Sequence, residues 1–184
     1  MTENKKQCCF IGHRQVLAKD IEDKLTAAII SEIESGCSSF IVGTHGEYDE
    51  LALKVFRRLR DTERGDIRIQ VAITSLNQIK KRGALYAPYC DVDTVMYAIE
   101  DAHYKRQITV SNMQMIDNCD RIICYVNTAA YRSGAKTALR YAQKQGLKIV
   151  NLYREQDQPL YGMTIEQIKE LFNQTRVSGP PYPI

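Results

Sequence analysis

Residues 7–14 read Gln-Cys-Cys-Phe-Ile-Gly-His-Arg, an apolar run that ends at a glycine and continues into two basic side chains. A short, continuous apolar run of this kind is typical of a strand that is buried on both faces of a sheet. Residues 21–33 then carry apolar side chains at helical spacing, and Gly36 stands just beyond them, where the end of a helix favours glycine. The chain therefore opens with a predicted strand and helix.

The same alternation of strand and helix continues along the chain. We expect further strands at 40–42, 67–73, 121–126 and 148–152, and helices at 46–60, 105–118, 133–144 and 164–173. This pattern predicts the α/β class, as one Rossmann-like domain over residues 1–177. Its sheet is expected to be mostly parallel and five-stranded, in the order 3-2-1-4-5, with helices on both faces. Residues 178–184 contain three prolines and predict an extended tail.

Composition excludes several classes of protein. The chain has 184 residues, of which 44% are apolar and 26% are charged, with a net charge of +3, so a disordered chain is excluded. No apolar run is long enough to span a membrane, and the first residues lack the apolar core of a secretory signal. We therefore expect a cytoplasmic protein with no membrane partner. The nearly even charge balance makes nucleic acid an unlikely partner.

Six cysteines occur, but no Cys-x-x-Cys motif does. Because most of them lie in or beside apolar runs, we expect reduced, buried thiols rather than disulfides. His13, His45 and His103 are far apart in sequence and have no second ligand at a metal-binding spacing. We expect no metal site and no cofactor.

Ligands of an open parallel sheet bind beyond the carboxyl ends of its strands, where the strand order reverses. After the first strand stand Gly12, His13 and Arg14. Arginine offers a planar fork that suits phosphate or carboxylate, and glycine permits a sharp exit from the strand. The alternative is a glycine turn followed by two solvated side chains.

The second strand leads into a turn with two glycines that opens a helix. Gly43, Thr44 and Gly46 could bind an anion there, because a helix N-terminus presents free N–H groups. The alternative is structural, since Thr44-x-x-Glu47 matches a capping box. Glu47 and Asp49 are also the candidate acid/base residues, or could bind ribose hydroxyls.

The loop after the fourth predicted strand is the best candidate anion site. Ser133 is a good N-cap, and Gly134 would let a ligand approach the backbone closely. The alternative is a simple capped helix with its cations in solvent. The candidate ligand-binding residues of this loop are Arg132, Ser133, Gly134, Ala135, Lys136 and Thr137.

Residues 75–104 have no regular pattern, and such a segment is often a lid or a binding loop. Four tyrosines between residues 80 and 104 could stack on a base, or could cover the sheet instead. An additional strand in this segment is a third alternative.

Taken together, these motifs resemble the SLOG superfamily, which unites the Smf/DprA and Lonely-guy (LOG) proteins. The likeness covers about residues 7–153 and rests on residues 12–14, 42–49, 119–126 and 134–136. It is strongest to bacterial SLOG domains of unknown function, and the YpsA proteins are more distant relatives. The resemblance implies a Rossmann-like domain that binds a nucleotide or a nucleotide-derived molecule.

The chain departs from the motif with which LOG enzymes cleave N-glycosidic bonds, Pro-Gly-Gly-x-Gly-Thr-x-x-Glu. With Gly134 aligned to the second glycine, Lys136 replaces the third glycine and Arg140 replaces the glutamate, whereas Thr137 matches. A cation thus replaces the carboxylate that assists ribose chemistry. This difference disfavours the LOG reaction by the LOG residues and leaves anion binding intact.

Three functions follow as expectations. The first is binding of a nucleotide or a nucleotide-derived phosphorylated small molecule. The second is an N-glycosidase or phosphoribohydrolase that acts on nucleotides, with Glu47 or Asp49 as acid/base. The third is a DprA-like module associated with nucleic acid, which the near-neutral charge disfavours. Whether a reaction is catalysed, and whether the chain forms a homo-oligomer, stay open.

Overall fold

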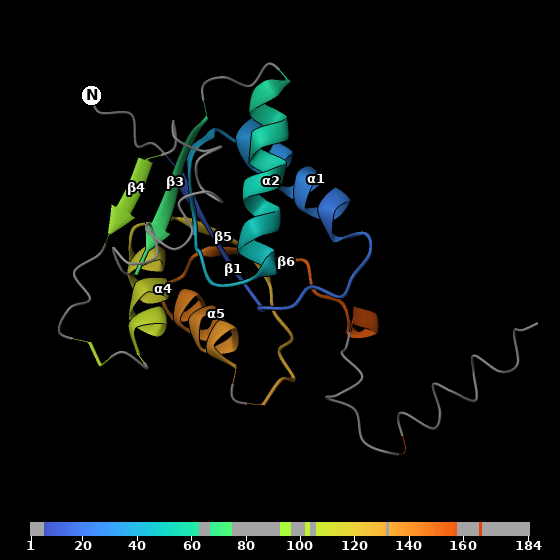
Figure 1. The fold of residues 1–184 in the computed structure, drawn as a ribbon, viewed down its shortest axis with the longest axis vertical. Helices are drawn as coiled ribbons and strands as arrows, with labels where there is room; N and C mark the ends of the chain where they lie inside the picture. The colour runs from blue at the N-terminus through green and yellow to red at the C-terminus, as the bar shows by residue number, and fades with distance from the viewer. Residues whose placement is uncertain are drawn as a thin grey trace, which may run out of the picture.

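The computed structural model describes residues 6–62, 67–74, 93–96, 102–103, 106–131, 133–157 and 166. In this part of the chain, a parallel sheet lies between two pairs of helices (Figure 1). Apart from residue 166, the predicted helix at 164–173 and the tail at 178–184 fall outside the described residues. The tyrosines of the 80–104 segment fall outside them as well.

The sheet has six strands in the order β4-β3-β2-β1-β5-β6, and every neighbouring pair is parallel. Its strands are β1 (Lys6–Gly12), β2 (Cys37–Val42), β3 (Arg68–Ile73), β4 (Asp93–Met96), β5 (Arg121–Tyr125) and β6 (Lys148–Asn151). The five predicted strands are present, and their predicted 3-2-1-4-5 order is confirmed. The additional strand is β4, which pairs with β3 at the edge of the sheet and lies in the 75–104 segment, for which an additional strand is one of the three alternatives.

Among the described residues, two helices cover each face of the sheet, and helices on both faces are what a Rossmann-like α/β domain predicts. The helices α1 (Ile21–Glu34) and α2 (Glu47–Asp61) lie on one face, and α4 (Gln107–Asp117) and α5 (Gly134–Lys144) lie on the other (Figure 1). A short 3₁₀ helix at Glu155–Asp157 follows β6. The end of α1 is marked by Gly36, whose φ of +88° is a conformation that glycine adopts without strain.

Alternation of side chains along each strand divides the core into two layers. On β1, Cys8 and Phe10 face α1 and α2, whereas Cys9 and Ile11 face α4 and α5. The Phe10 ring stands edge-on to the Phe56 ring, with ring centroids 5.3 Å apart. Because β1 is buried on both faces, its continuous apolar run follows directly from its central position in the sheet.

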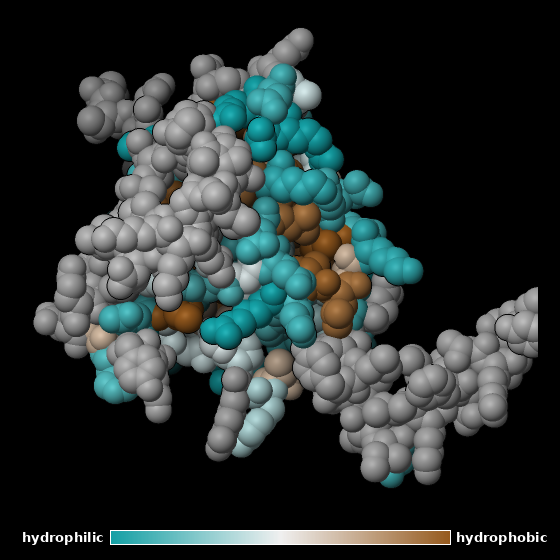
Figure 2. All heavy atoms as spheres, in the orientation of Figure 1, coloured by the Kyte–Doolittle hydropathy of each residue, from teal (hydrophilic) through white to brown (hydrophobic). Residues whose placement is uncertain are grey.

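The helix α2 buries one face against the sheet and exposes the other. Its apolar side chains at positions 48, 52, 55, 56 and 59 recur at helical spacing and are buried against the sheet. Its outward face carries hydrophilic side chains, as Figure 2 shows. Beside α2, an apolar patch appears over the connection from β1 to α1, where Leu17 is 48% exposed.

The amino ends of β5 and β6 are held by a buried carboxylate. Glu32 of α1 is 2% exposed and forms ion pairs with Arg121 and, at 2.8 Å, with Lys148. Burial opposes ionisation of Glu32, but the hydrogen bonds from Lys148 and Arg121 outweigh it and hold the pKa of this carboxyl below its usual value. This ion cluster lies at the amino ends of the strands. It is therefore at the opposite end of the sheet from the switch point, the place beyond the carboxyl ends of β1 and β5 where the strand order reverses.

The described cysteines are free thiols, and four of the five are buried: Cys8, Cys9, Cys37 and Cys124. Burial raises the pKa of Cys37 to about 11 and that of Cys124 to about 12, so neither is ionised near neutral pH. None of the helices in the described part of the chain combines the length and apolar character of a membrane span.

Candidate functional site

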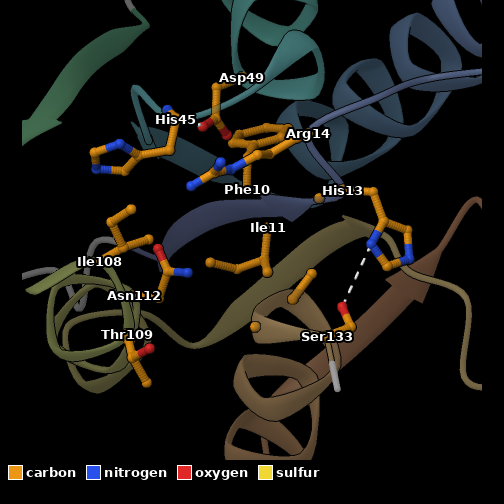
Figure 3. A pocket seen from close by; sticks show the side chains of 13 residues that line it. Phe10, Ile11, His13, Arg14, His45, Asp49, Ile108, Thr109, Asn112 and Ser133 are labelled. Atoms are coloured by element: carbon orange, nitrogen blue, oxygen red, sulfur yellow. Dashed lines mark hydrogen bonds between the residues drawn. The ribbon is translucent and has the colours of Figure 1, made fainter. Parts of the chain in front are cut away.

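A pocket of about 360 Å³ lies between the segments that follow β1 and β5, where the strand order reverses. Figure 3 shows Arg14 and Asp49 on one side, residues of α4 on the opposite side, and Ser133 at the start of α5. Its volume falls within the range of about 300–1,000 Å³ that small-molecule sites occupy. The lining residues are Phe10, Ile11, Gly12, His13, Arg14, His45, Asp49, Ile108, Thr109, Asn112, Ser133, Gly134 and Ala135.

The N-terminus of α5 forms one end of this pocket. The Ser133 hydroxyl oxygen accepts from the Lys136 backbone N–H at 3.2 Å, which confirms the predicted N-cap. The backbone N–H groups of Gly134 and Ala135 donate to no residue that the structure describes. The first turn of an α-helix leaves such donors unpaired, and the helix dipole adds partial positive charge there. This end of the pocket is therefore suited to an anion.

Arg14 adds a full positive charge to the same pocket. Its side chain is exposed, lines the pocket and makes no hydrogen bond or ion pair with a described residue. Figure 3 shows the guanidinium group extending over the pocket near Asp49. A planar guanidinium group binds phosphate or carboxylate with two parallel hydrogen bonds.

The remaining candidates of the α5 loop lie elsewhere. The Lys136 ammonium group donates to the Ala130 carbonyl at 3.0 Å, and Lys136 does not line the pocket. The Thr137 hydroxyl donates to the Ser133 carbonyl at 3.2 Å and is outside the pocket as well. Arg132 falls outside the described residues. The backbone and Ser133, rather than the lysine, thus face the pocket at this end.

His13 connects the ends of β1 and β5 to the start of α5. Its Nε2 accepts from the Asn127 backbone N–H at 2.7 Å, and its Nδ1 lies 3.4 Å from the Ser133 hydroxyl oxygen (Figure 3). Since Nε2 accepts a hydrogen bond, a neutral imidazole carries its proton on Nδ1. Burial lowers the pKa of His13, which favours this neutral form.

The structural alternative for the turn before α2, a capping box formed by Thr44 and Glu47, is wrong. The Thr44 hydroxyl donates to the Ala72 carbonyl on β3 at 3.3 Å, and the N-cap position is Gly46. The Glu47 carboxylate accepts from the Val16 backbone N–H at 2.9 Å and does not line the pocket. Long-range bonds to neighbouring strands and loops thus replace the local bonds of the box.

The α2 N-terminus is closed by the chain itself. The Glu47 N–H donates to the Arg14 carbonyl at 2.9 Å, and the Asp49 carboxylate accepts from the His45 N–H at 2.8 Å. Asp49 is 9% exposed and lines the pocket. Of the two candidate helix N-termini, α5 presents to the pocket amides that donate to no described residue, whereas α2 presents the Asp49 carboxylate.

Three of the candidate glycines are explained by close packing. A Cβ atom at Gly12 would lie 2.3 Å from Cδ1 of Tyr48, and one at Gly46 would lie 2.7 Å from the Arg14 Cα. A Cβ atom at Gly43 would lie 2.8 Å from an Asp49 carboxylate oxygen. Gly12 lines the pocket, but Gly43 and Gly46 do not. Gly134 differs, since a Cβ atom there would meet nothing within 4 Å.

The residues of α4 that line one side of the pocket were not identified from the sequence. Ile108, Thr109 and Asn112 line the pocket, and Figure 3 shows the Asn112 amide directed toward Ile11. Positions 108 and 112 share one face of a helix, which the predicted helix at 105–118 could have indicated. The direction of that face depends on how α4 packs, so no local signal separates it from a solvated face. His45 also lines the pocket.

The arrangement fits binding better than nucleophilic catalysis by Ser133. A histidine that activates a serine must accept the hydroxyl proton at the nearer nitrogen. Nδ1 carries the proton in the tautomer that the Asn127 N–H imposes, so it has no lone pair for Ser133. Among the described residues, no group of three or more His, Cys, Asp or Glu side chains is placed to hold a metal ion.

The fold and the pocket define a class of protein: a Rossmann-like α/β domain with a pocket at the switch point of its sheet. No family model and no curated protein matches the chain.

Proposed function

We propose that this chain binds a nucleotide, or a phosphorylated molecule derived from one, in the switch-point pocket. One observation carries the proposal: the N–H groups of Gly134 and Ala135 and the guanidinium group of Arg14, which bond to no described residue, line the same pocket. Backbone donors at a helix N-terminus together with an arginine are a recurrent means of binding phosphate. The resemblance to the SLOG superfamily supports the same ligand class.

The remainder of the pocket suits the rest of such a ligand. Asp49 provides a carboxylate acceptor for ribose hydroxyls, and Asn112 provides an amide that both donates and accepts. Ile108 of α4, which is only partly buried, contributes apolar surface against which a base or sugar can pack. The pocket thus combines an anion-binding end with polar and apolar walls.

Thermal shift with matched ligands tests the proposal. Nucleoside monophosphates should raise the melting temperature, whereas the corresponding nucleosides should do so much less. A ligand at about 100 times its Kd adds about 2.7 kcal/mol to the free energy of unfolding, or roughly 5–11 °C for a domain of this size. A nucleotide panel that shifts the melting temperature no more than salt of equal ionic strength would overturn the proposal.

A hydrolase is the second candidate function, and the position of Asp49 favours it. Asp49 lines the pocket whereas Glu47 does not, so Asp49 is the acid/base candidate that the structure supports. Incubation with nucleoside monophosphates should then release free base. Asp49→Asn keeps an acceptor for the His45 N–H but cannot transfer a proton, so it should abolish release. Absence of free base from every nucleotide that binds would exclude this candidate.

A further inference from the structure

The hydrogen bonds of Ser133 leave one direction for its hydroxyl hydrogen. The oxygen of this group accepts from the Lys136 backbone N–H at 3.2 Å and faces His13 Nδ1 at 3.4 Å. If Ser133 donated to Nδ1, a neutral imidazole would carry its proton on Nε2. That N–H would then point at the Asn127 backbone N–H, whose nitrogen lies 2.7 Å from Nε2. Two donors cannot share that contact, so Nδ1 donates and both lone pairs of the hydroxyl oxygen are occupied.

We infer that His13 is a positioning residue, which directs the hydroxyl hydrogen of Ser133 into the pocket as a donor to an oxyanion of the ligand. This inference rests on the proposed function, because it concerns the same pocket. Ser133 lines that pocket beside the N–H groups of Gly134 and Ala135, which donate to no described residue. His13 itself acts through Ser133 and the loop from Asn127, whose backbone it holds.

This orientation of the Ser133 hydroxyl should make the pocket distinguish between ionised oxyanions and hydroxyl groups. With the hydroxyl hydrogen directed inward, Ser133 and the two backbone amides present donors only at this end of the pocket. A fully ionised oxyanion accepts from all three, whereas a hydroxyl or a protonated phosphate oxygen brings a hydrogen that meets another donor. The site should therefore bind sulfate and dianionic phosphate groups and discriminate against ligands that present a hydroxyl there.

A double-mutant cycle with sulfate as the probe tests the relay from His13 to Ser133. Sulfate stays a dianion across the working pH range, so its own titration does not interfere. Binding is followed by NMR titration of the Gly134 and Ala135 amide signals, which measures weak affinities. The variants are His13→Gln, Ser133→Ala and the double variant. The Gln side-chain oxygen can still accept from the Asn127 N–H, whereas Gln has no ring N–H at the position of Nδ1.

We expect Ser133→Ala to lower sulfate affinity about tenfold, because a hydrogen bond to a charged group is lost. His13→Gln should lower it several-fold when Ser133 is present and leave it unchanged in the Ser133→Ala background. Non-additivity of this kind identifies residues that act as a unit. Equal losses in both backgrounds, or no loss in His13→Gln, would overturn the inference, because His13 would then not act through Ser133.

Two substitutions at Ser133 separate the donor from the helix cap. Ser133→Asp keeps a good N-cap but replaces the hydroxyl by an acceptor, so the melting temperature should hold while sulfate binding is lost. Ser133→Thr keeps both cap and hydroxyl and should restore affinity close to that of the unaltered protein. Unchanged sulfate binding by Ser133→Asp would refute a donor role.

The same variants distinguish this inference from the proposed function. If adenosine monophosphate binds with affinity that neither His13→Gln nor Ser133→Ala alters, the inference fails and nucleotide binding stands. If sulfate shows the coupled loss but no nucleotide binds, the proposed function fails and the positioning role stands. A lack of any shift of the Gly134 and Ala135 signals in excess sulfate would overturn the positioning role.

Discussion

Two glycines at the pocket should respond in opposite ways to an added side chain. A Cβ atom at Gly12 would lie 2.3–2.6 Å from three atoms of Tyr48, whereas one at Gly134 would meet nothing within 4 Å. Tyr48 is fully buried and stacks on Tyr125 with ring centroids 6.0 Å apart, so it has little room to move. We therefore predict that Gly12→Ala destabilises the fold and that Gly134→Val does not.

The magnitudes follow from these contacts. Overpacking of a core costs about 1–3 kcal/mol, which for a domain of this size lowers the melting temperature by roughly 2–12 °C. Valine is no worse than glycine on helix propensity scales, so Gly134→Val should change the free energy of unfolding by about 0.5 kcal/mol or less. Its branched side chain would instead occupy the approach to the Gly134 and Ala135 amides and weaken binding of adenosine monophosphate.

Melting temperature by circular dichroism and affinity by calorimetry, measured on both variants, check this prediction. A Gly12→Ala variant that melts like the unaltered protein would refute the packing argument for Tyr48. A Gly134→Val variant that is folded and binds the nucleotide with unchanged affinity would show that no phosphate group approaches the start of α5.

Three further predictions concern charged groups. Arg14→Ala should lower nucleotide affinity about tenfold or more with a change in stability of about 0.5 kcal/mol, whereas Lys19→Ala, which removes an exposed cation outside the pocket, should alter neither in calorimetry and thermal melts. Glu32→Gln should lower the free energy of unfolding, measured in urea, by about 3–5 kcal/mol, because Arg121 loses its buried partner. A decrease of about 1 kcal/mol or less, which is typical of exposed ion pairs, would contradict this. Since burial lowers the pKa of His13, the stability that its neutral form contributes is present above its ordinary pKa of about 6.5 and is lost as pH falls below it. His13→Gln should remove that part of the pH dependence, and identical pH profiles for the two proteins would contradict the assignment.

Local patterns in the sequence determined the elements and their order. Apolar runs and helical stripes depend on residues a few positions apart, so the strands, the two pairs of helices and the Ser133 cap could be predicted. The rule that ligands bind where the strand order reverses then nominated residues after β1 and β5, and a pocket lies between the segments that follow these two strands. The sixth strand, β4, has no comparable local signal, because a four-residue edge strand needs no continuous apolar run.

The tertiary structure decided which of the nominated groups face the pocket. Thr44 and Glu47 match a local capping motif, yet their side chains bond to Ala72 and Val16, which only the packed sheet brings near. The tautomer of His13 likewise depends on Asn127, which is 114 positions away in the chain. Sequence patterns record which bonds a residue can make with its neighbours, whereas folding chooses between those bonds and distant partners by their geometry and burial. For that reason the chain's sequence nominated two helix N-termini, and only its packing left the amides of α5 open to a ligand.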